Sequence, residues 1–331
     1  MNVGKKDNGN SGSGSGGSRI SSKGRDVRMM ELEGSVEKDR IKERGRVGKS
    51  RYANISEYGL QTYLLIAVCV SVMVLTVLLV NVVLNGVERL SPNLLFNYAS
   101  SNVDEAGMRA AILGSLYTVA LAIAIALPLG IATGLYLNEY GGGNLVSRMV
   151  YATLTNLAGV PSVIFGLVAL SFLSYTLGLG RSIIVGSIAL AFLVLPLITV
   201  TTIESTRMVP STHRLAAYAL GARKYQVVFK VVLPQIIPTV LTSSILALSR
   251  AMGEAAPILV ISGLIFVRRD PLSIFDEFTV MPLQIYNWVS RPQQAFIELS
   301  AAGIIVLLLI LLTLNVIAIY LRNRIQRRVV E

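Results

Sequence analysis

Long apolar stretches without charged residues dominate the chain from residue 58 onward. Six intervals contain no Asp, Glu, Lys or Arg, and these are 58–87, 110–138, 149–180, 182–203, 231–249 and 299–321. A helix of about 20 apolar residues crosses the hydrocarbon core of a bilayer, so each interval can hold one span. We therefore predict an all-α polytopic membrane protein with six transmembrane helices near 62–85, 111–136, 150–173, 183–204, 236–260 and 299–321.

A polar segment, residues 1–58, precedes the first span. It contains the run SGSGSGGS at 11–18, which is typical of a flexible coil, and a mixed-charge stretch at 38–51. We expect a disordered basic tail over 1–58 and a membrane domain over 59–331.

The composition agrees with a membrane protein. Of the 331 residues, 53% are hydrophobic and only 15% are charged, whereas soluble domains carry about 25% charged residues. The net charge of +11 lies in the tail and the loops, which favours contact with anionic lipid over nucleic acid. One cysteine, Cys69, and one histidine, His213, exclude an internal disulfide and a multi-histidine metal centre.

Basic residues predict the orientation of the spans. Thirteen Lys and Arg residues lie in the tail. More follow in the loop between the fourth and fifth spans and after the last span: Arg207, Arg214, Arg223, Lys224, Lys230, Arg322, Arg324, Arg327 and Arg328. Cytoplasmic loops carry an excess of basic residues, so we expect both termini to be cytoplasmic.

The loop between the fourth and fifth spans predicts a short helix that docks on a partner. Ser211 or Thr212 can cap its start, and Gly221 can end it in a left-handed turn. Ala216, Ala217 and Leu220 give it a small apolar face, which suits a groove on a soluble protein.

This loop, 205–235, resembles the EAA loop of binding-protein-dependent ABC importer permeases, with Leu215 in place of the glutamate. In that family the loop forms the coupling helix, which contacts the ATPase subunit. The resemblance assigns ATPase coupling to Leu215, Ala216, Ala217, Gly221, Ala222, Leu233 and Pro234.

Further segments narrow the resemblance to PstA-type permeases of phosphate importers. The segment 250–257 reads RAMGEAAP and is similar to the family's R-A-x-G-E-T-A-P, with Ala255 replacing threonine. Similar matches are NLAGVPS at 156–162, GLYLNEY at 134–140 and MPLQIYNW at 281–288, so that the resemblance covers about 110–324.

The resemblance implies a type I ABC importer permease that moves inorganic phosphate into the cytoplasm and is not itself an enzyme. It also implies a homologous second permease, two ATP-binding subunits and an extracytoplasmic phosphate-binding protein as partners. ATP and Mg would be bound by the ATPase subunits, and this chain would bind no cofactor.

Arg250 and Glu254 are the only charged residues within the predicted fifth span. A charge at mid-bilayer costs about 2.5–3.5 kcal/mol on insertion scales, so two of them require an explanation. Their spacing of four places them on one helical face, with Gly253 between them for close helix approach. We hypothesise that Arg250 attracts phosphate in the pathway and that Glu254 neutralises it when the pathway is empty. The alternative is a structural pair that locks this span to a neighbour.

Other classes of protein are possible. An ABC permease for another oxyanion would use the same arginine. An ion-coupled secondary transporter typically shows intramembrane acids in several spans and internal repeats, whereas here one pair stands alone. A membrane-embedded enzyme would need a nucleophile–base pair or a metal cluster, which we do not find in the sequence.

Overall fold

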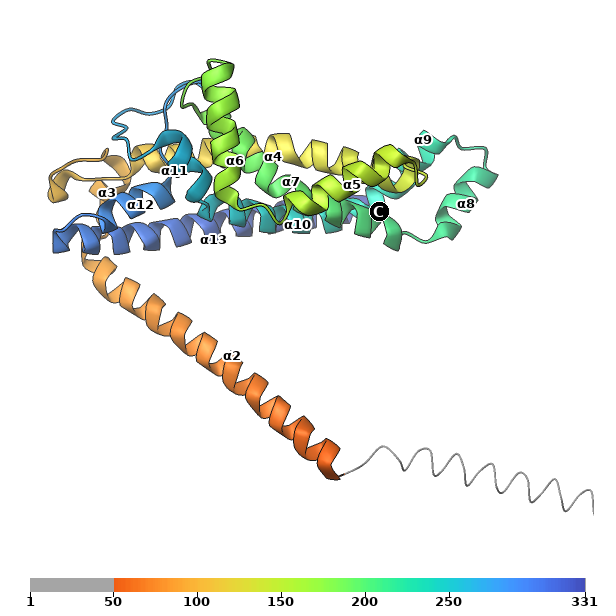
Figure 1. Cartoon of the computed structure of the whole chain (residues 1–331), viewed down its shortest axis with the longest axis horizontal. Helices are drawn as coiled ribbons and strands as arrows, with labels where there is room; N and C mark the ends of the chain where they lie inside the picture. Colours follow the sequence, from red (N-terminus) through yellow and green to blue (C-terminus); the bar gives the residue numbers. More distant parts are fainter. Residues whose placement is uncertain (1–50, 331) are drawn as a thin grey trace, which may run out of the picture. The chain divides into compact units, whose positions relative to one another are not determined.

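The computed structural model describes residues 51–330, and side chains over 58–326. Within this part every regular element is a helix, and Ser182 and Glu277 form one isolated antiparallel bridge. The α-helices are α2 (Arg51–Gly86), α3 (Pro92–Phe96), α4 (Arg109–Leu135), α5 (Leu145–Leu157), α6 (Ser162–Val168), α7 (Ile183–Met208), α8 (Ser211–Ala219), α9 (Lys224–Val227), α10 (Leu233–Gly253), α11 (Ala256–Ser262), α12 (Met281–Val289) and α13 (Gln294–Val330) (Figure 1).

Shorter helical segments extend or link these helices. They are the 3₁₀-helices η1 (Val87–Arg89) and η2 (Val103–Glu105) and the π-helices η3 (Tyr136–Tyr140), η4 (Ala169–Thr176) and η5 (Val228–Val232). Each π-helix continues a neighbouring α-helix, so α4 runs on through η3 and α6 runs on through η4.

The predicted tail lies mostly outside the described residues, which begin at Arg51. The segment 51–58, placed in the tail by its composition, is the first part of α2. The chain divides into two compact units within this helix, one ending at Thr76 and the other beginning at Val77. All other described helices belong to the second unit.

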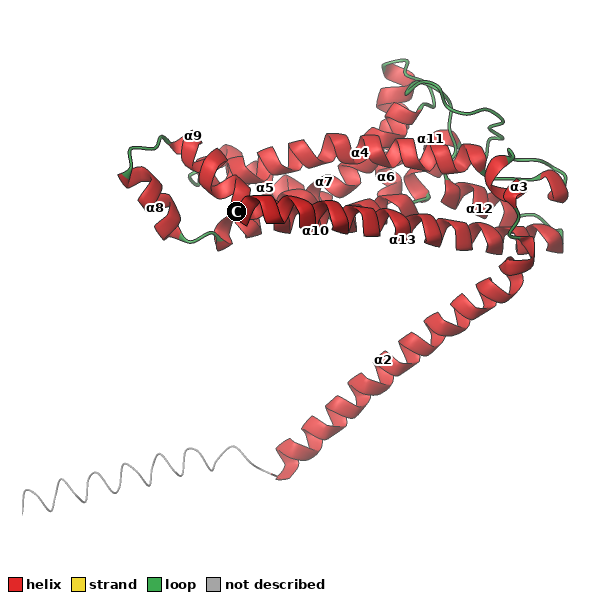
Figure 2. Ribbon diagram, turned by 180° about the vertical axis from the view of Figure 1, so that it is seen from behind, coloured by secondary structure: helices red, strands yellow, loops and turns green. Residues whose placement is uncertain are grey.

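Four long helices, α4, α7, α10 and α13, form the body of the second unit, with α7 packed against both α4 and α10 (Figure 2). Glycines allow α4 to approach α7 closely. A Cβ atom at Gly130 would lie 2.7 Å from Ile198, and one at Gly134 would lie 2.6 Å from Thr202. Distances under 3.0 Å are closer than real Cβ atoms come, so these two helices fit together only because both positions lack a side chain.

The predicted third span, 150–173, is not one straight helix. It consists of α5 and the continuous pair α6–η4, which meet at an angle of 111°. Residues 158–161 form the break, and Pro161 precedes α6, so it cannot donate a hydrogen bond that would continue α5. Within the described residues, five helices are long and apolar enough to cross a membrane, and there are six if the bent pair is counted as one span.

Contacts at both ends of the bent pair support counting it as a crossing. Just before α5, Glu139 pairs with Arg214 of α8. Just after η4, the Ile183 N–H donates to the Asp276 carbonyl in the loop between α11 and α12 (3.1 Å). The helix α8 precedes the start of α10 and the loop 263–280 follows its other end through α11, so the chain enters and leaves the bent pair toward opposite ends of the bundle.

The predicted fifth span also has different limits. A continuous run of helix extends from Lys224 through α9, η5 and α10, but it ends at Gly253 rather than at residue 260. Glu254 has an extended backbone (φ −80°, ψ 115°), and α11 begins after it with Pro257 in its first turn. Arg250 and Glu254 therefore do not share one helical face, contrary to the prediction.

Candidate functional site

A cavity of about 220 Å³ lies where the break in the bent pair faces α7 and the end of α10. Its lining consists of Leu157, Ala158, Val160, Phe165, Leu193, Pro196, Leu197, Val200 and Arg250. The α7 residues of this set lie around the middle of that helix, and Arg250 is the one charged residue in the lining. The structure therefore brings a predicted pathway residue into an otherwise apolar cavity deep in a spanning region.

Arg250 occupies the last turn of α10, where the helix dipole favours a positive charge. Its side chain is 56% exposed in the single chain. A charged side chain inside a spanning region almost always faces the bundle interior or a water-filled cavity, because exposure to lipid is costly. The guanidinium therefore lies at the cavity and not in the packed core.

Glu254 forms a loose ion pair with this guanidinium. Arg250 Nε lies 3.8 Å from Glu254 Oε1, which is longer than a hydrogen bond. Glu254 is the C-cap residue of α10, so both partners belong to the same segment. This pair does not lock α10 to a neighbouring helix. Instead, Ser249 donates to Asn315 Oδ1 of α13 at 2.7 Å and joins the two helices.

Gly253 does not provide the close approach that its place between the two charges suggested. A Cβ atom there would meet nothing within 4 Å in the described chain. The close approach is at Gly166 of α6, where a Cβ atom would lie 2.5 Å from the Pro257 carbonyl oxygen of α11. Pro257 ends the segment 250–257 of the phosphate-permease resemblance and Gly166 follows the segment 156–162, but the contact between them could not be read from their spacing.

The loop 205–235 contains the predicted short helix, α8, although its start differs. Its N-cap is Pro210, with no side-chain capping bond, so the predicted cap at Ser211 or Thr212 is wrong. The predicted left-handed turn is confirmed, since Gly221 has φ +81°. The N–H groups of Gly221 and Ala222 donate to the carbonyls of Tyr218 and Ala217, the two bonds of a Schellman motif.

The residues assigned to coupling divide into two groups. Leu215 is 64% exposed, and Ala216 and Gly221 are also exposed. Ala217, Ala222 and Leu233 pack instead against the hydrophobic core, and half-buried Pro234 lies in the first turn of α10. The outward surface of the loop also includes Leu220, which is 90% exposed. The predicted apolar face of Ala216, Ala217 and Leu220 is therefore split, with only Ala217 turned inward.

Two contacts that the sequence did not indicate hold α8 and α9 to the end of α4. Arg214 of α8 pairs with Glu139 of η3 at 2.8 Å. Lys224 Nζ of α9 lies 4.8 Å from the centroid of the Tyr140 ring. The paired residues are far apart in the chain, and no spacing rule connects them.

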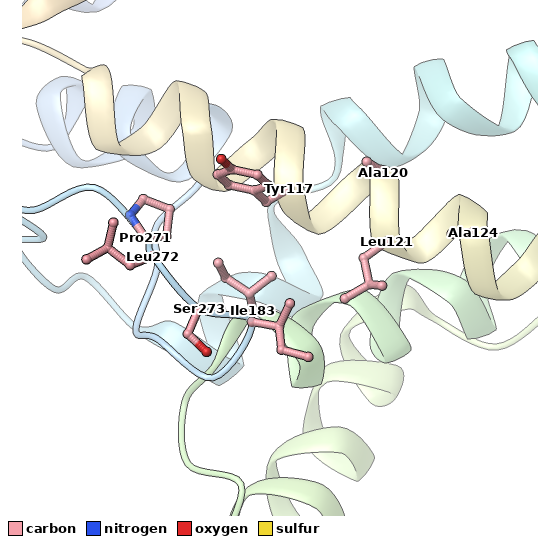
Figure 3. A pocket seen from close by; sticks show the side chains of 9 residues that line it. Tyr117, Ala120, Leu121, Ala124, Ile183, Pro271, Leu272 and Ser273 are labelled. Atoms are coloured by element: carbon pink, nitrogen blue, oxygen red, sulfur yellow. The ribbon is translucent and has the colours of Figure 1, made fainter.

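A second cavity, of about 400 Å³, lies between α4, the start of α7 and the loop 263–280. Side chains from α4, among them Tyr117 and Leu121, face Ile183 and the loop residues Pro271–Ser273 (Figure 3). Its lining contains no charged side chain, so it offers an anion no partner comparable to Arg250. Within the described residues, no three His, Cys, Asp or Glu side chains lie together as a metal site requires.

Comparison with known protein families identifies the family to which this chain belongs. The family described as the binding-protein-dependent transport system inner membrane component matches residues 126–331, which include the broken span, α8 and Arg250. The chain belongs to this family. The resemblance found in the EAA loop is thereby confirmed, and the protein is a multi-pass membrane protein.

Three relatives each match two thirds or more of the chain. The phosphate transport system permease protein PstA 1 of Mycobacterium tuberculosis (strain H37Rv) is 34% identical over 224 residues, covering 67% of this chain and 71% of its own length. PstA of Xylella fastidiosa (strain Temecula1) is 34% identical over 226 residues, covering 67% and 78%. The probable ABC transporter permease protein YqgI of Bacillus subtilis is 29% identical over 259 residues, covering 75% and 88%.

Solved structures share the fold at low sequence identity. A chain of the MetNI methionine ABC transporter in an inward-facing conformation aligns with a TM-score of 0.50 at 19% identity, covering 67% of this chain and 97% of its own. A chain of a bacterial alginate ABC transporter complex aligns with a TM-score of 0.52 at 16% identity, covering 66% and 78%. The predicted importer permease fold is confirmed by these matches.

Proposed function

We propose that the chain is the transmembrane permease subunit of an ATP-driven importer of inorganic phosphate. The observation that carries this proposal is the Arg250 guanidinium in an apolar cavity beside a broken span, in a chain of the binding-protein-dependent permease family. Relatives at 34% identity that are named phosphate transport permeases support phosphate as the substrate.

Arg250 is the residue to which we assign phosphate binding in the pathway. A guanidinium donates paired hydrogen bonds in a planar fork that matches phosphate oxygens. Its 3.8 Å separation from Glu254 leaves these donors free to turn toward an anion. Glu254 would balance the charge when no phosphate is present, and phosphate would compete with it transiently.

The exposed surface of α8 and its C-cap, with Leu215, Ala216 and Leu220, is the part that we assign to the contact with an ATP-binding subunit. In this arrangement both termini and α8 are cytoplasmic, and the loop 263–280 faces the side from which a phosphate-binding protein delivers substrate. A homologous second permease and two ATP-binding subunits complete the complex. ATP is hydrolysed by those subunits, so the chain moves phosphate without being an enzyme.

Uptake measurements test this proposal. The chain is reconstituted into liposomes with its co-purifying subunits and binding protein, and ³²P-labelled phosphate uptake is followed with and without internal ATP. We expect ATP-dependent uptake that excess sulfate does not inhibit. Inhibition by sulfate would favour the permease for another oxyanion, and uptake driven by a pH gradient without ATP would favour a secondary transporter.

Substitutions of Arg250 test its assigned part. Loss of one charge-assisted hydrogen bond to phosphate, worth about 1.5–3 kcal/mol, should lower uptake at least about tenfold in Arg250→Ala. Arg250→Lys keeps the positive charge but lacks the planar fork of donors, so its uptake should lie between that of the wild type and that of Arg250→Ala. Arg207→Ala removes an exposed arginine of α7 and serves as the matched control. Wild-type uptake by a normally assembled Arg250→Ala complex would contradict the assignment.

A further inference from the structure

Arg214 binds two elements besides its own helix. Its Nη1 group donates to the Val209 carbonyl at 2.7 Å. Its Nη2 group donates to Glu139 Oε1 and to the Thr206 carbonyl, both at 2.8 Å. Thr206 lies in the last turn of α7, Val209 caps that helix, and Glu139 lies in η3 at the end of α4. One guanidinium thus joins α8 to the ends of α4 and α7.

Stability alone does not account for this arrangement. The side chains of Arg214 and Glu139 are only 19% and 9% exposed. Well-packed apolar residues often serve the fold as well as a buried ion pair does, because the charges must lose their water. The Nε–H of Arg214 is also buried and has no hydrogen-bond partner among the described residues, which is a further cost. What the group does provide is a fixed geometry between three elements.

The same three elements lead to the Arg250 cavity. The close contacts at Gly130 and Gly134 hold α4 and α7 together, so a displacement of their ends moves them as a pair. Val200 of α7 lines the cavity and lies six residues before Thr206, or about 9 Å along the helix. A shift of α8 is therefore carried to the cavity wall by the last turns of α7, which Arg214 contacts.

We propose that Arg214 is a positioning residue that transmits movement of α8 to α4 and α7, and so couples ATP hydrolysis to opening of the phosphate cavity. This proposal rests on the proposed function, in which ATP-binding subunits move α8. Loss of the Arg214 hydrogen bonds to α4 and α7 should leave α8 able to bind and stimulate the ATP-binding subunits. The helices α4 and α7 should then follow the movement of α8 less closely.

The test is a coupling ratio, measured in liposomes that hold the whole complex and its binding protein. Imported ³²P-phosphate is divided by the ADP formed over the same time. In Arg214→Gln we expect ADP formation to continue while the ratio of imported phosphate to ADP falls at least about fivefold. Coupling between two sites typically changes an equilibrium by about fivefold or more, which sets this lower limit. Glu139→Gln removes the charge of the acceptor but leaves the bonds to α7, so its ratio should fall less. Arg207→Gln removes an exposed arginine from the last turn of α7, the helix end that Arg214 contacts, and should keep the wild-type ratio.

The outcomes separate coupling from folding. An unchanged ratio in Arg214→Gln, or import and ADP formation that fall in proportion, would overturn the proposal. If Arg214→Gln does not assemble, Glu139→Gln and Arg214→Lys decide by the same ratio. Absence of ATP-dependent uptake in the unsubstituted complex would overturn the proposed function itself, and that result is visible before any residue is changed.

Discussion

At the scale of single residues, Asp276 shows how the loop 263–280 keeps its shape at the end of the bundle opposite α8. Its carboxylate accepts hydrogen bonds from the N–H groups of Leu272 (2.8 Å) and Ser273 (2.9 Å). The bond from Ser273 and then that from Leu272 lower the pKa of Asp276, because they stabilise the charged form. The turn holds Leu272 outward, with 94% of this residue exposed.

The sign of this pKa shift predicts how the turn responds to pH. A carboxylate whose pKa is lowered in the folded state stabilises that state fully above its unfolded pKa. This stabilisation is lost as the pH falls through the folded pKa. The turn should therefore stay protected from hydrogen exchange down to pH values below the ordinary aspartate pKa of about 3.9. In Asp276→Ala the amides of Leu272 and Ser273 should exchange about two- to tenfold faster at pH values where the wild-type carboxylate is charged, as expected for the loss of one hydrogen bond each, and the difference should shrink as the pH falls through the folded pKa.

Hydrogen-exchange mass spectrometry over 270–278 measures this effect. Glu277→Ala is the matched control, because that neighbouring carboxylate is exposed and receives neither bond. Equal protection in Asp276→Ala and the wild type would show that the backbone contacts with Ile183 and Ile184 hold the loop without the carboxylate.

At the scale of helices, bilayer thickness made most of the fold predictable. Charge-free intervals located α2, α4, α7 and α13, because a span must be apolar over a fixed length. The break at 158–161 was not predicted, since the interval 149–180 is apolar throughout and its composition does not depend on helix direction. The end of α10 at Gly253 was not predicted either, because the spacing of four between Arg250 and Glu254 suits a continuous helix. Only Pro161 and Pro257 signal these breaks, and prolines also occur inside α4, α7 and α10.

The candidate site was predictable where local motifs carried it and not where distant segments meet. Arg250 and the Gly221 turn could be found from the sequence, because an intramembrane charge and a helix-ending glycine are local signals. The ion pair between Arg214 and Glu139 could not be found from the sequence, because the two residues are 75 positions apart and meet only after α4 and α7 have packed.

Packing of α4 against α7 gives a prediction at this scale. A methyl group at Gly134 would lie 2.6 Å from Thr202 Cβ, so Gly134→Ala should push the helices apart and cost about 1–3 kcal/mol of stability. Gly253→Ala is the control, because a Cβ atom there meets nothing within 4 Å and alanine favours the helix. Thermal unfolding of the purified protein in detergent compares them, and an unchanged midpoint in Gly134→Ala would show that α4 and α7 can separate without cost.

At the scale of the whole molecule, the bent pair decides which side of the membrane each segment faces. If α5 and α6–η4 together cross the bilayer, the chain has six spans, and the tail, α8 and the C-terminal end of α13 share one side. If the pair enters and leaves on the same side, the chain has five spans and α8 lies opposite the tail. The contacts of Glu139 with Arg214 and of Ile183 with Asp276 place the segments before and after the pair toward opposite ends of the bundle, which favours six.

Cysteine labelling in sealed vesicles tests this count. With the single native cysteine removed by Cys69→Ser, one cysteine is introduced at Ser18 in the tail, at Leu220 on α8, or at Leu272 in the loop 263–280. Leu220 and Leu272 are 90% and 94% exposed, so both substitutions should be accepted and both thiols should react. With six spans, a membrane-impermeant maleimide labels Ser18→Cys and Leu220→Cys from one side and Leu272→Cys from the other. Labelling of Ser18→Cys and Leu220→Cys from opposite sides would mean five spans, and it would remove α8 from the side on which the tail lies.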